Sequence, residues 1–238
     1  MSPSATTATQ GGTPAPSLPT PGPTDGLPAI TIDEPPLGAV VDVPFGISGT
    51  ADVFEAALSV QVLTDAGVLV CQHNLTATSG SGTRGDWSTS MAFPPPAPPA
   101  GQEAVPMTVR AFDYSAEDGS EENVVSVNVN VSGIRPPIVI DEPGCDASVA
   151  AGRSISVSGT ARVFEGALQL ELLDSSGTSV VSQTVQAESG VGEAPWSTTI
   201  TVPPSAFPGT YRLVAFSYSP MGGSRENDFA IPLDVAPP

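Results

Sequence analysis

The chain has 238 residues, enough for two ordinary domains, and carries 25 acidic residues, seven arginines and no lysine, for a formal net charge of −18. Nucleic acids and anionic membranes are bound by Lys and Arg side chains that neutralise phosphates, so this charge excludes nucleic-acid binding. The sequence contains no apolar run long enough to span a membrane and no long stretch of helical periodicity, which argues against all-α and α/β folds.

The first 28 residues are rich in Pro, Thr, Ser, Ala and Gly, a composition that predicts a disordered tether. This segment has neither the charged start nor the apolar centre of a signal peptide. We therefore expect a secretion signal or lipid anchor upstream of Met1.

The rest of the chain is a tandem repeat. "ITIDEPPLGAVV" from Ile30 returns as "IVIDEPGCDASV" from Ile138, and "SGTADVFEAAL" from Ser48 returns as "SGTARVFEGAL" from Ser158. Later segments match in the same order, and the offset changes only where loops gain or lose residues. The chain is therefore predicted to contain the same module twice.

The matches place one domain at residues 29–132 and the other at 138–236. Residues 133–137, "GIRPP", form a short linker with two prolines, which should hold the domains at a restricted angle. Residues 1–28 precede both domains.

Each repeat reads as a series of strands. In "VSVNVNV" from Val125 the valines alternate with Ser126, Asn128 and Asn130, so the valines should face a core and the polar residues solvent. About seven such segments per repeat are separated by turns rich in Gly, Pro and Asp. This pattern predicts an all-β chain of two tandem antiparallel β-sandwiches.

The repeated Phe-Glu pair suggests two hypotheses. Glu55 and Glu165 could be catalytic carboxylates, but such acids work in close pairs, and here each repeat holds one with no partner acid beside it. We favour a structural motif in which Phe54 and Phe164 are buried at the end of the core. The glutamates would then lie in the following turn.

Two tryptophans stand at equivalent places, each near the start of a strand that follows a glycine-rich loop. Burial of Trp87 and Trp196 between the sheets is the expected arrangement. The alternative is an exposed platform on which sugar rings stack.

The two cysteines are not equivalent, since Cys71 lies in a strand, "GVLVCQH", and Cys145 in a loop, "DEPGCDA". We expect two free thiols because each domain is self-sufficient without a bridge. An interdomain disulfide is the alternative.

The sequence lacks the residue patterns that catalysis or cofactor binding would need. His73 is the only histidine and has no counterpart in the second repeat, so it is expected to be an ordinary strand residue. Without lysine there is no Schiff base, the His and Cys residues do not make a zinc site, and no glycine-rich loop has the phosphate-binding pattern. We predict no enzyme activity, no catalytic residue and no cofactor.

Two acidic clusters are weak candidates for calcium. Asp118 and Glu122 share the loop "AEDGSEEN", and Asp141 and Glu142 lie near the domain junction. Calcium needs six to eight oxygen ligands, and the DxDxDG spacing of a calcium loop is missing. We therefore interpret both clusters as solvated charge and predict no metal.

The order IxIDEP, SGTAxVFExAL, a late Trp, AFxYS and GSxEN resembles the immunoglobulin-like domain of bacterial spore-germination proteins, the Gmad family, across nearly all of residues 28–235. The resemblance implies an immunoglobulin-like sandwich in an exported, envelope-associated protein, often a lipoprotein, and supplies no catalytic residues. Neither repeat has the intersheet cysteine pair of antibody domains. Tyr211 occupies a place like that of the tyrosine corner, where the first repeat has Met107.

The predicted function is that of a non-catalytic, exported cell-envelope or extracellular protein acting as a binding, adhesion or spacer module. Its partner would be an envelope protein or glycan. The alternative is a carbohydrate-binding accessory region of a larger cell-wall enzyme.

Overall fold

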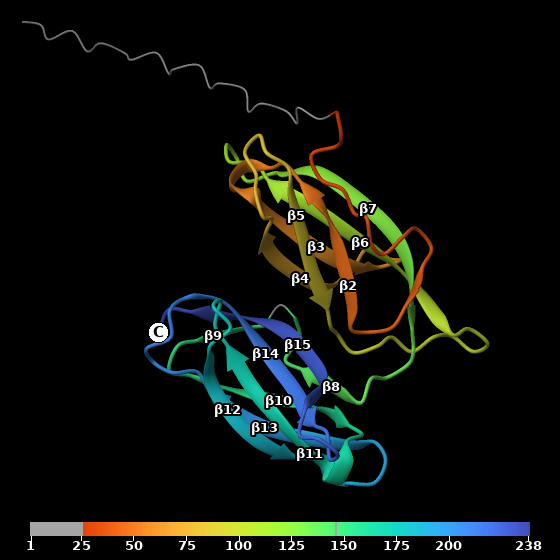
Figure 1. Cartoon of the computed structure of the whole chain (residues 1–238), viewed down its shortest axis with the longest axis vertical. Coiled ribbons are helices and arrows are strands. Elements are labelled where there is room, and N and C mark those ends of the chain that lie inside the picture. Colours follow the sequence, from red (N-terminus) through yellow and green to blue (C-terminus); the bar gives the residue numbers. More distant parts are fainter. Residues whose placement is uncertain (1–25, 146) are drawn as a thin grey trace, which may run out of the picture.

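The computed structural model describes residues 26–145 and 147–238, and the predicted tether lies almost entirely outside them. Figure 1 shows two β-sandwiches, one after the other along the chain. Their only helical elements are two single turns of 3₁₀ helix, η1 (Phe54–Ala56) and η2 (Phe164–Gly166). The prediction of an all-β chain is confirmed.

The first sandwich, called domain 1 below, has a five-stranded and a two-stranded sheet. The larger sheet has the order β1-β7-β6-β3-β4, in which β1 runs parallel to β7, and β2 pairs with β5 in the other. Single bridges add Ile30 and Glu34 to β2. Its strands are β1 (Val40–Val41), β2 (Phe45–Ala51), β3 (Ala57–Thr64), β4 (Leu69–Thr76), β5 (Gly85–Met91), β6 (Ala104–Tyr114) and β7 (Glu121–Ser132).

The second sandwich, domain 2, repeats this topology. Its larger sheet has the order β12-β11-β14-β15-β9, with β9 parallel to β15, and its smaller sheet has the order β13-β10-β8. Its strands are β8 (Ile138–Glu142), β9 (Ser148–Ala150), β10 (Ser154–Ala161), β11 (Ala167–Leu173), β12 (Ser179–Gln186), β13 (Ala194–Thr201), β14 (Gly209–Tyr218) and β15 (Arg225–Ala236).

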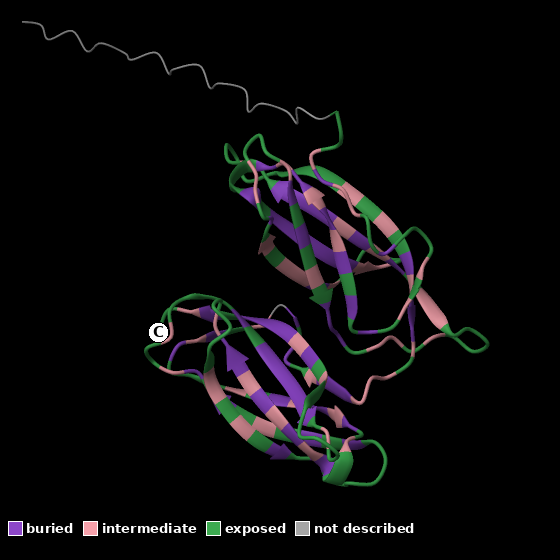
Figure 2. Cartoon of the chain, viewed as in Figure 1, coloured by how far each residue is buried: buried purple, intermediate pink, exposed green. Residues whose placement is uncertain are grey.

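Alternation of residue type explains which face of each sheet is buried, as Figure 2 shows for both sandwiches. In β7, Val129 and Val131 are buried, whereas Ser126 and Asn128 are exposed. Successive side chains of a strand point to opposite faces, so the valines reach the core and the polar residues reach solvent. The predicted orientation of this strand is confirmed.

The glycine of the repeated "SGTA" segment is explained by the close approach of a neighbouring backbone segment and of the tryptophan across the small sheet. Trp87 faces Gly49 in the β2–β5 pair, and a Cβ on Gly49 would lie 2.0 Å from the Thr31 carbonyl oxygen and 2.9 Å from the Trp87 ring. A Cβ on Gly159 would lie 1.9 Å from the backbone oxygen of Val139. Only glycine allows these close approaches.

Candidate binding surface and interdomain cleft

The 3₁₀ turn that carries the Phe-Glu pair does not have the expected orientation. Phe54 and Phe164 are 52% and 62% exposed, so the prediction that they are buried is wrong. Val53, only 4% exposed, fills the end of the domain 1 core instead. The backbone is left-handed at Glu55, with φ of 54°, and this tight turn leaves the preceding phenylalanine on the outer surface.

The turn is held against the glycine-rich segment before β5. A Cβ on Gly80 would lie 2.6 Å from the Val53 carbonyl oxygen, and the Glu55 backbone N–H donates a 3.0 Å hydrogen bond to Ser81 Oγ. Glu55 and Glu165 are both exposed, each in the turn of its own sandwich. The structure does not bring these two carboxylates together as a catalytic pair.

The tryptophans are buried, with 3% of Trp87 and 2% of Trp196 exposed, as expected. An exposed stacking platform built on these two residues is therefore ruled out. Tyr211, also buried, donates a 3.1 Å hydrogen bond from its hydroxyl to the Phe207 carbonyl oxygen, in the manner of a tyrosine corner.

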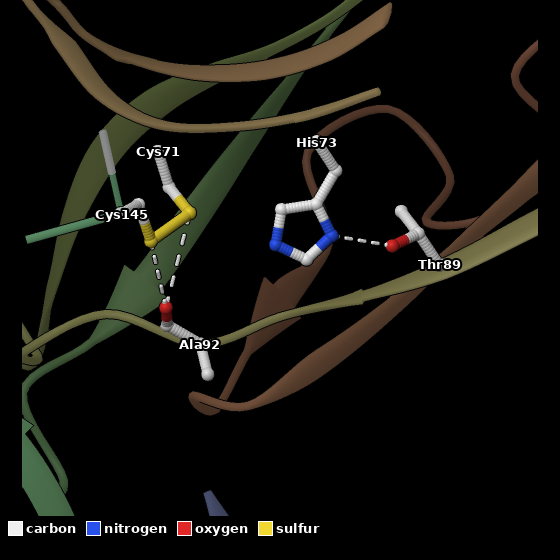
Figure 3. Close-up of a disulfide and its surroundings, with 5 residues drawn as sticks. All are labelled: Cys71, His73, Thr89, Ala92 and Cys145. Atoms are coloured by element: carbon white, nitrogen blue, oxygen red, sulfur yellow. Dashed lines mark hydrogen bonds between the residues drawn. A yellow bond between two sulfur atoms is a disulfide. The ribbon is translucent and has the colours of Figure 1, made fainter. Parts of the chain in front are cut away.

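A disulfide joins Cys71 of β4 to Cys145 of the loop between β8 and β9, with 5.1 Å between their Cα atoms. The expectation of two free thiols is wrong. Within each repeat neither cysteine has a partner, and it is the packing of the second sandwich on the first that brings them together. Figure 3 shows both sulfurs beside the Ala92 carbonyl oxygen, which lies 3.2 Å from Cys145 Sγ.

A cleft of about 450 Å³ lies beside this disulfide, between the two domains. Domain 1 contributes polar side chains of β4 and β5, and domain 2 contributes residues of β14 and β15, among them Arg212 and Asp234. Asp234 accepts a 2.8 Å hydrogen bond from the hydroxyl of Thr210, another lining residue. The cleft therefore exists only where the two domains meet.

His73 lines this cleft. Its Nδ1 lies 2.7 Å from Thr89 Oγ1 (Figure 3), and its buried Nε2 has no hydrogen-bond partner among the described residues. Burial lowers the pKa of His73 to about 4, and the positive charge of Arg212 acts in the same direction. The imidazole is therefore neutral at neutral pH.

A second hollow, of about 630 Å³, lies on domain 1 at the β3–β4 side of the larger sheet. Phe54 and Tyr114 line it, together with Glu55 and the β4 residues Gln72 and Asn74. Asn74 Oδ1 accepts hydrogen bonds from Ser59 Oγ, at 2.7 Å, and from Gln72 Nε2, at 3.0 Å. The hollow thus combines exposed aromatic rings with a fixed row of polar groups.

The acidic clusters considered for calcium are dispersed. Asp118 accepts hydrogen bonds from the backbone N–H and the hydroxyl of Ser120, and these bonds lower its pKa. Asp141 forms an ion pair with Arg135 at 3.3 Å, and Glu122 and Glu142 are exposed. Across residues 26–145 and 147–238, no three His, Cys, Asp or Glu residues are placed to hold a metal ion.

Both repeats match a known protein family. Residues 29–120 and 137–224 each match the immunoglobulin-like domain of bacterial spore germination. The chain belongs to this family. Both sandwiches are therefore immunoglobulin-like domains, as the sequence resemblance predicted. No curated protein sequence matches the chain.

Solved structures with a similar arrangement are distant. A tetra-tandem repeat from the extending region of a large adhesion protein is 17% identical, with a TM-score of 0.31, covering 81% of this chain and 45% of that one. The BSP domain of a biofilm-associated protein is 11% identical, with a TM-score of 0.26, covering 87% and 29%. The D1–D4 ectodomain fragment of ICAM-5 is 14% identical, with a TM-score of 0.32, covering 87% and 53%. The chain spans about half or less of each of these chains.

Within the described ranges, no helix is both long and apolar enough to cross a membrane.

Proposed function

We propose that this protein is an exported, non-catalytic module of the cell envelope, in which a disulfide locks two immunoglobulin-like domains into one rigid binding or spacer unit. Residues 1–28 would tether this unit, and residues 133–137 would be the linker between its domains. The Cys71–Cys145 disulfide is the observation that carries the proposal.

The disulfide supports export because such bonds form and persist in oxidising compartments and are rare in the reducing cytosol. It also supports rigidity. With the linker as one connection and the disulfide as a second, the domains lose the freedom to swing that a single short linker would leave.

The arrangement of titratable groups supports a non-catalytic role. His73 is held neutral by burial, and among the described residues its Nδ1 lies against the Thr89 hydroxyl and not against the carboxylate that a catalytic triad would require. The two glutamates of the repeated motif lie in separate domains, so neither has the paired acid of a glycosidase.

The experiment compares the wild type with a Cys71→Val, Cys145→Leu double variant, which introduces the residues found at the equivalent places, Val181 and Leu37. We expect a single narrow distribution of interdomain distances for the wild type, measured by spin-label or fluorescence pairs, and a broad one for the variant. Unchanged circular dichroism would show that both domains of the variant stay folded.

Thiol labelling of the protein in intact source cells provides the matching test of export. Protected cysteines that label only after reduction are expected. Reduced cysteines in that material, or an equally narrow distance distribution in the double variant, would contradict the proposal.

A further inference from the structure

The hollow on domain 1 and the interdomain cleft share lining residues on one strand, β4. Gln72 and Asn74 of β4 line both the outer hollow, with Phe54 and Tyr114, and the interdomain cleft, with His73 and Arg212. β4 is the edge strand of its sheet. Because they share these two lining residues, the hollow and the cleft adjoin at β4, and the two together are called the β4 groove below; a linear ligand could occupy both.

The outer end of the β4 groove offers aromatic surface to solvent. Phe54 is 52% exposed and Tyr114 is 50% exposed, although a fully apolar ring such as Phe is usually buried. The Tyr114 ring packs edge-on against the buried Phe112 ring at a centroid distance of 5.2 Å, which fixes its orientation. A fixed, exposed ring is a surface on which the apolar face of a sugar can stack.

The middle of the groove offers amide groups whose geometry is set in advance. Gln72 donates to Asn74 Oδ1, and its own Oε1 accepts a 2.8 Å hydrogen bond from Gln61 Nε2. An amide has two N–H donors and an oxygen with two lone pairs, so both side chains keep free positions. Donors and acceptors in a fixed row suit a ligand with many hydroxyl groups.

The inner end is lined by a buried imidazole and an exposed guanidinium. His73 Nε2 has no hydrogen-bond partner among the described residues, but it is closed off from solvent, so the ring forms part of the wall and is not a contact for a hydroxyl. Arg212, exposed in the same cleft, adds further donors.

The charge of the groove disfavours an acidic ligand. Glu55 and Asp234 stand against the single cation Arg212 among its lining residues, and the whole chain carries a net charge of −18. An acidic polymer would be repelled by this field. A peptide that extended the sheet is disfavoured because the Cys71 disulfide anchors domain 2 against the edge of β4.

We propose that the β4 groove binds a linear, neutral oligosaccharide. Its sugar rings would stack on Phe54 and Tyr114, and its hydroxyls would pair with Gln72, Asn74 and Arg212. This inference rests on the proposed function as an envelope-binding unit, for which it names the class of ligand.

The test is titration calorimetry of the full chain with soluble linear oligosaccharides of the cello, chito and malto series, and with a carboxylated oligosaccharide as the acidic arm. Phe54→Ala and Tyr114→Ala should each weaken binding about tenfold, from the loss of one ring contact. Phe164→Ala, the same change in the other repeat, is the matched control and should leave the affinity within about twofold. Arg212→Ala tests the inner end and should weaken binding of the same sugar.

Binding to none of the neutral sugars, equal loss in Phe54→Ala and Phe164→Ala, or a preference for the acidic arm would overturn the proposal. Capture of an extended peptide with no sugar binding would overturn it as well. Interdomain distances are measured on the same preparations. A fixed distance without sugar binding would therefore reject the groove and leave the spacer function standing.

Discussion

The two domains share one scaffold but differ at their junction. In domain 1, His73 on β4 contacts Thr89 on β5 at 2.7 Å, and at the equivalent place in domain 2 Gln183 on β12 donates to Thr198 on β13 at 2.8 Å. The cross-sheet contact is thus part of the scaffold. The imidazole, which lines the cleft, belongs to domain 1 alone.

The disulfide shows the same division. Domain 2 has Val181 where domain 1 has Cys71, and domain 1 has the exposed Leu37 where domain 2 has Cys145. The residues that build the junction replace ordinary scaffold residues without changing the strands around them. The imidazole and the disulfide therefore mark the contact between the domains, whereas the strands and the cross-sheet contact are common to both repeats.

Among the variants that test whether the two domains are equivalent, the tryptophan variants should have the largest effect on stability. Trp87→Ala and Trp196→Ala should each destabilise their own domain by about 3–5 kcal/mol, because each removes a large buried side chain. Fluorescence of the remaining tryptophan, followed in denaturant, reports the unmutated domain. If its transition moved as far as that of the mutated domain, the two modules would not be independent folding units.

His73→Gln sharpens the comparison because it places the domain 2 residue in domain 1. The folded-state pKa of His73, about 4, lies below the ordinary value of 6.5, so the unfolded chain takes up a proton first as the pH falls. Stability from the neutral ring is present above pH 6.5 and is lost towards pH 4, by on the order of 3 kcal/mol.

Denaturant unfolding at several pH values checks this prediction. Between pH 6.5 and 4 the wild type should lose stability more steeply than His73→Gln, and the two should have similar slopes above pH 7. Parallel curves across the whole range would show that the ring is not held neutral by its surroundings.

Tyr211→Phe should destabilise domain 2 by about 1 kcal/mol, the usual net contribution of one hydrogen bond, here the bond to the Phe207 carbonyl. Domain 1 has Met107 at this place and lacks the bond. Tyr218→Phe, at an exposed tyrosine of the same domain, is the control and should change the melting temperature little. If both changes lowered the stability of domain 2 equally, the Tyr211 hydrogen bond would not contribute specifically to that stability.

The smallest effect is expected in the repeated turn, where Ala56 has φ of 58° and the equivalent Gly166 has φ of 69°. A left-handed conformation costs a non-glycine residue about 1–2 kcal/mol, whereas glycine makes the unfolded chain more flexible. Ala56→Gly should therefore stabilise domain 1 by about 0.5 kcal/mol, measured by thermal unfolding. A clear loss would show that the methyl group packs in a way that domain 2 does not copy.

Local pattern was enough to predict the strands, their buried faces and the doubled module, because alternation and repeats are written along the chain. The burial of Trp87 and Trp196 followed from the usual place of a large aromatic ring between two sheets. Phe54 was mispredicted because its direction depends on the left-handed backbone at Glu55, which residue type does not reveal. The glycine at position 166 was the one sequence hint of such a turn.

The disulfide and the groove at the domain junction could not be predicted from the sequence for a different reason. Cys71 and Cys145 lie 74 residues apart, and whether they meet depends on how one sandwich packs on the other. The β4 groove is also non-local, since strand pairing and domain packing bring Tyr114, Gln72 and Arg212 to its walls. No spacing along the chain encodes such an arrangement.

The disulfide also determines how the protein would carry mechanical load. A force pulling on both ends of the chain would pass from Cys71 directly to Cys145 and bypass everything between them, including β5, β6 and β7. The bypassed segment, 74 residues in sequence separation, would otherwise release on the order of 250 Å of extended chain. The disulfide would thereby keep this segment from unravelling under tension, which limits how far the molecule can extend under load.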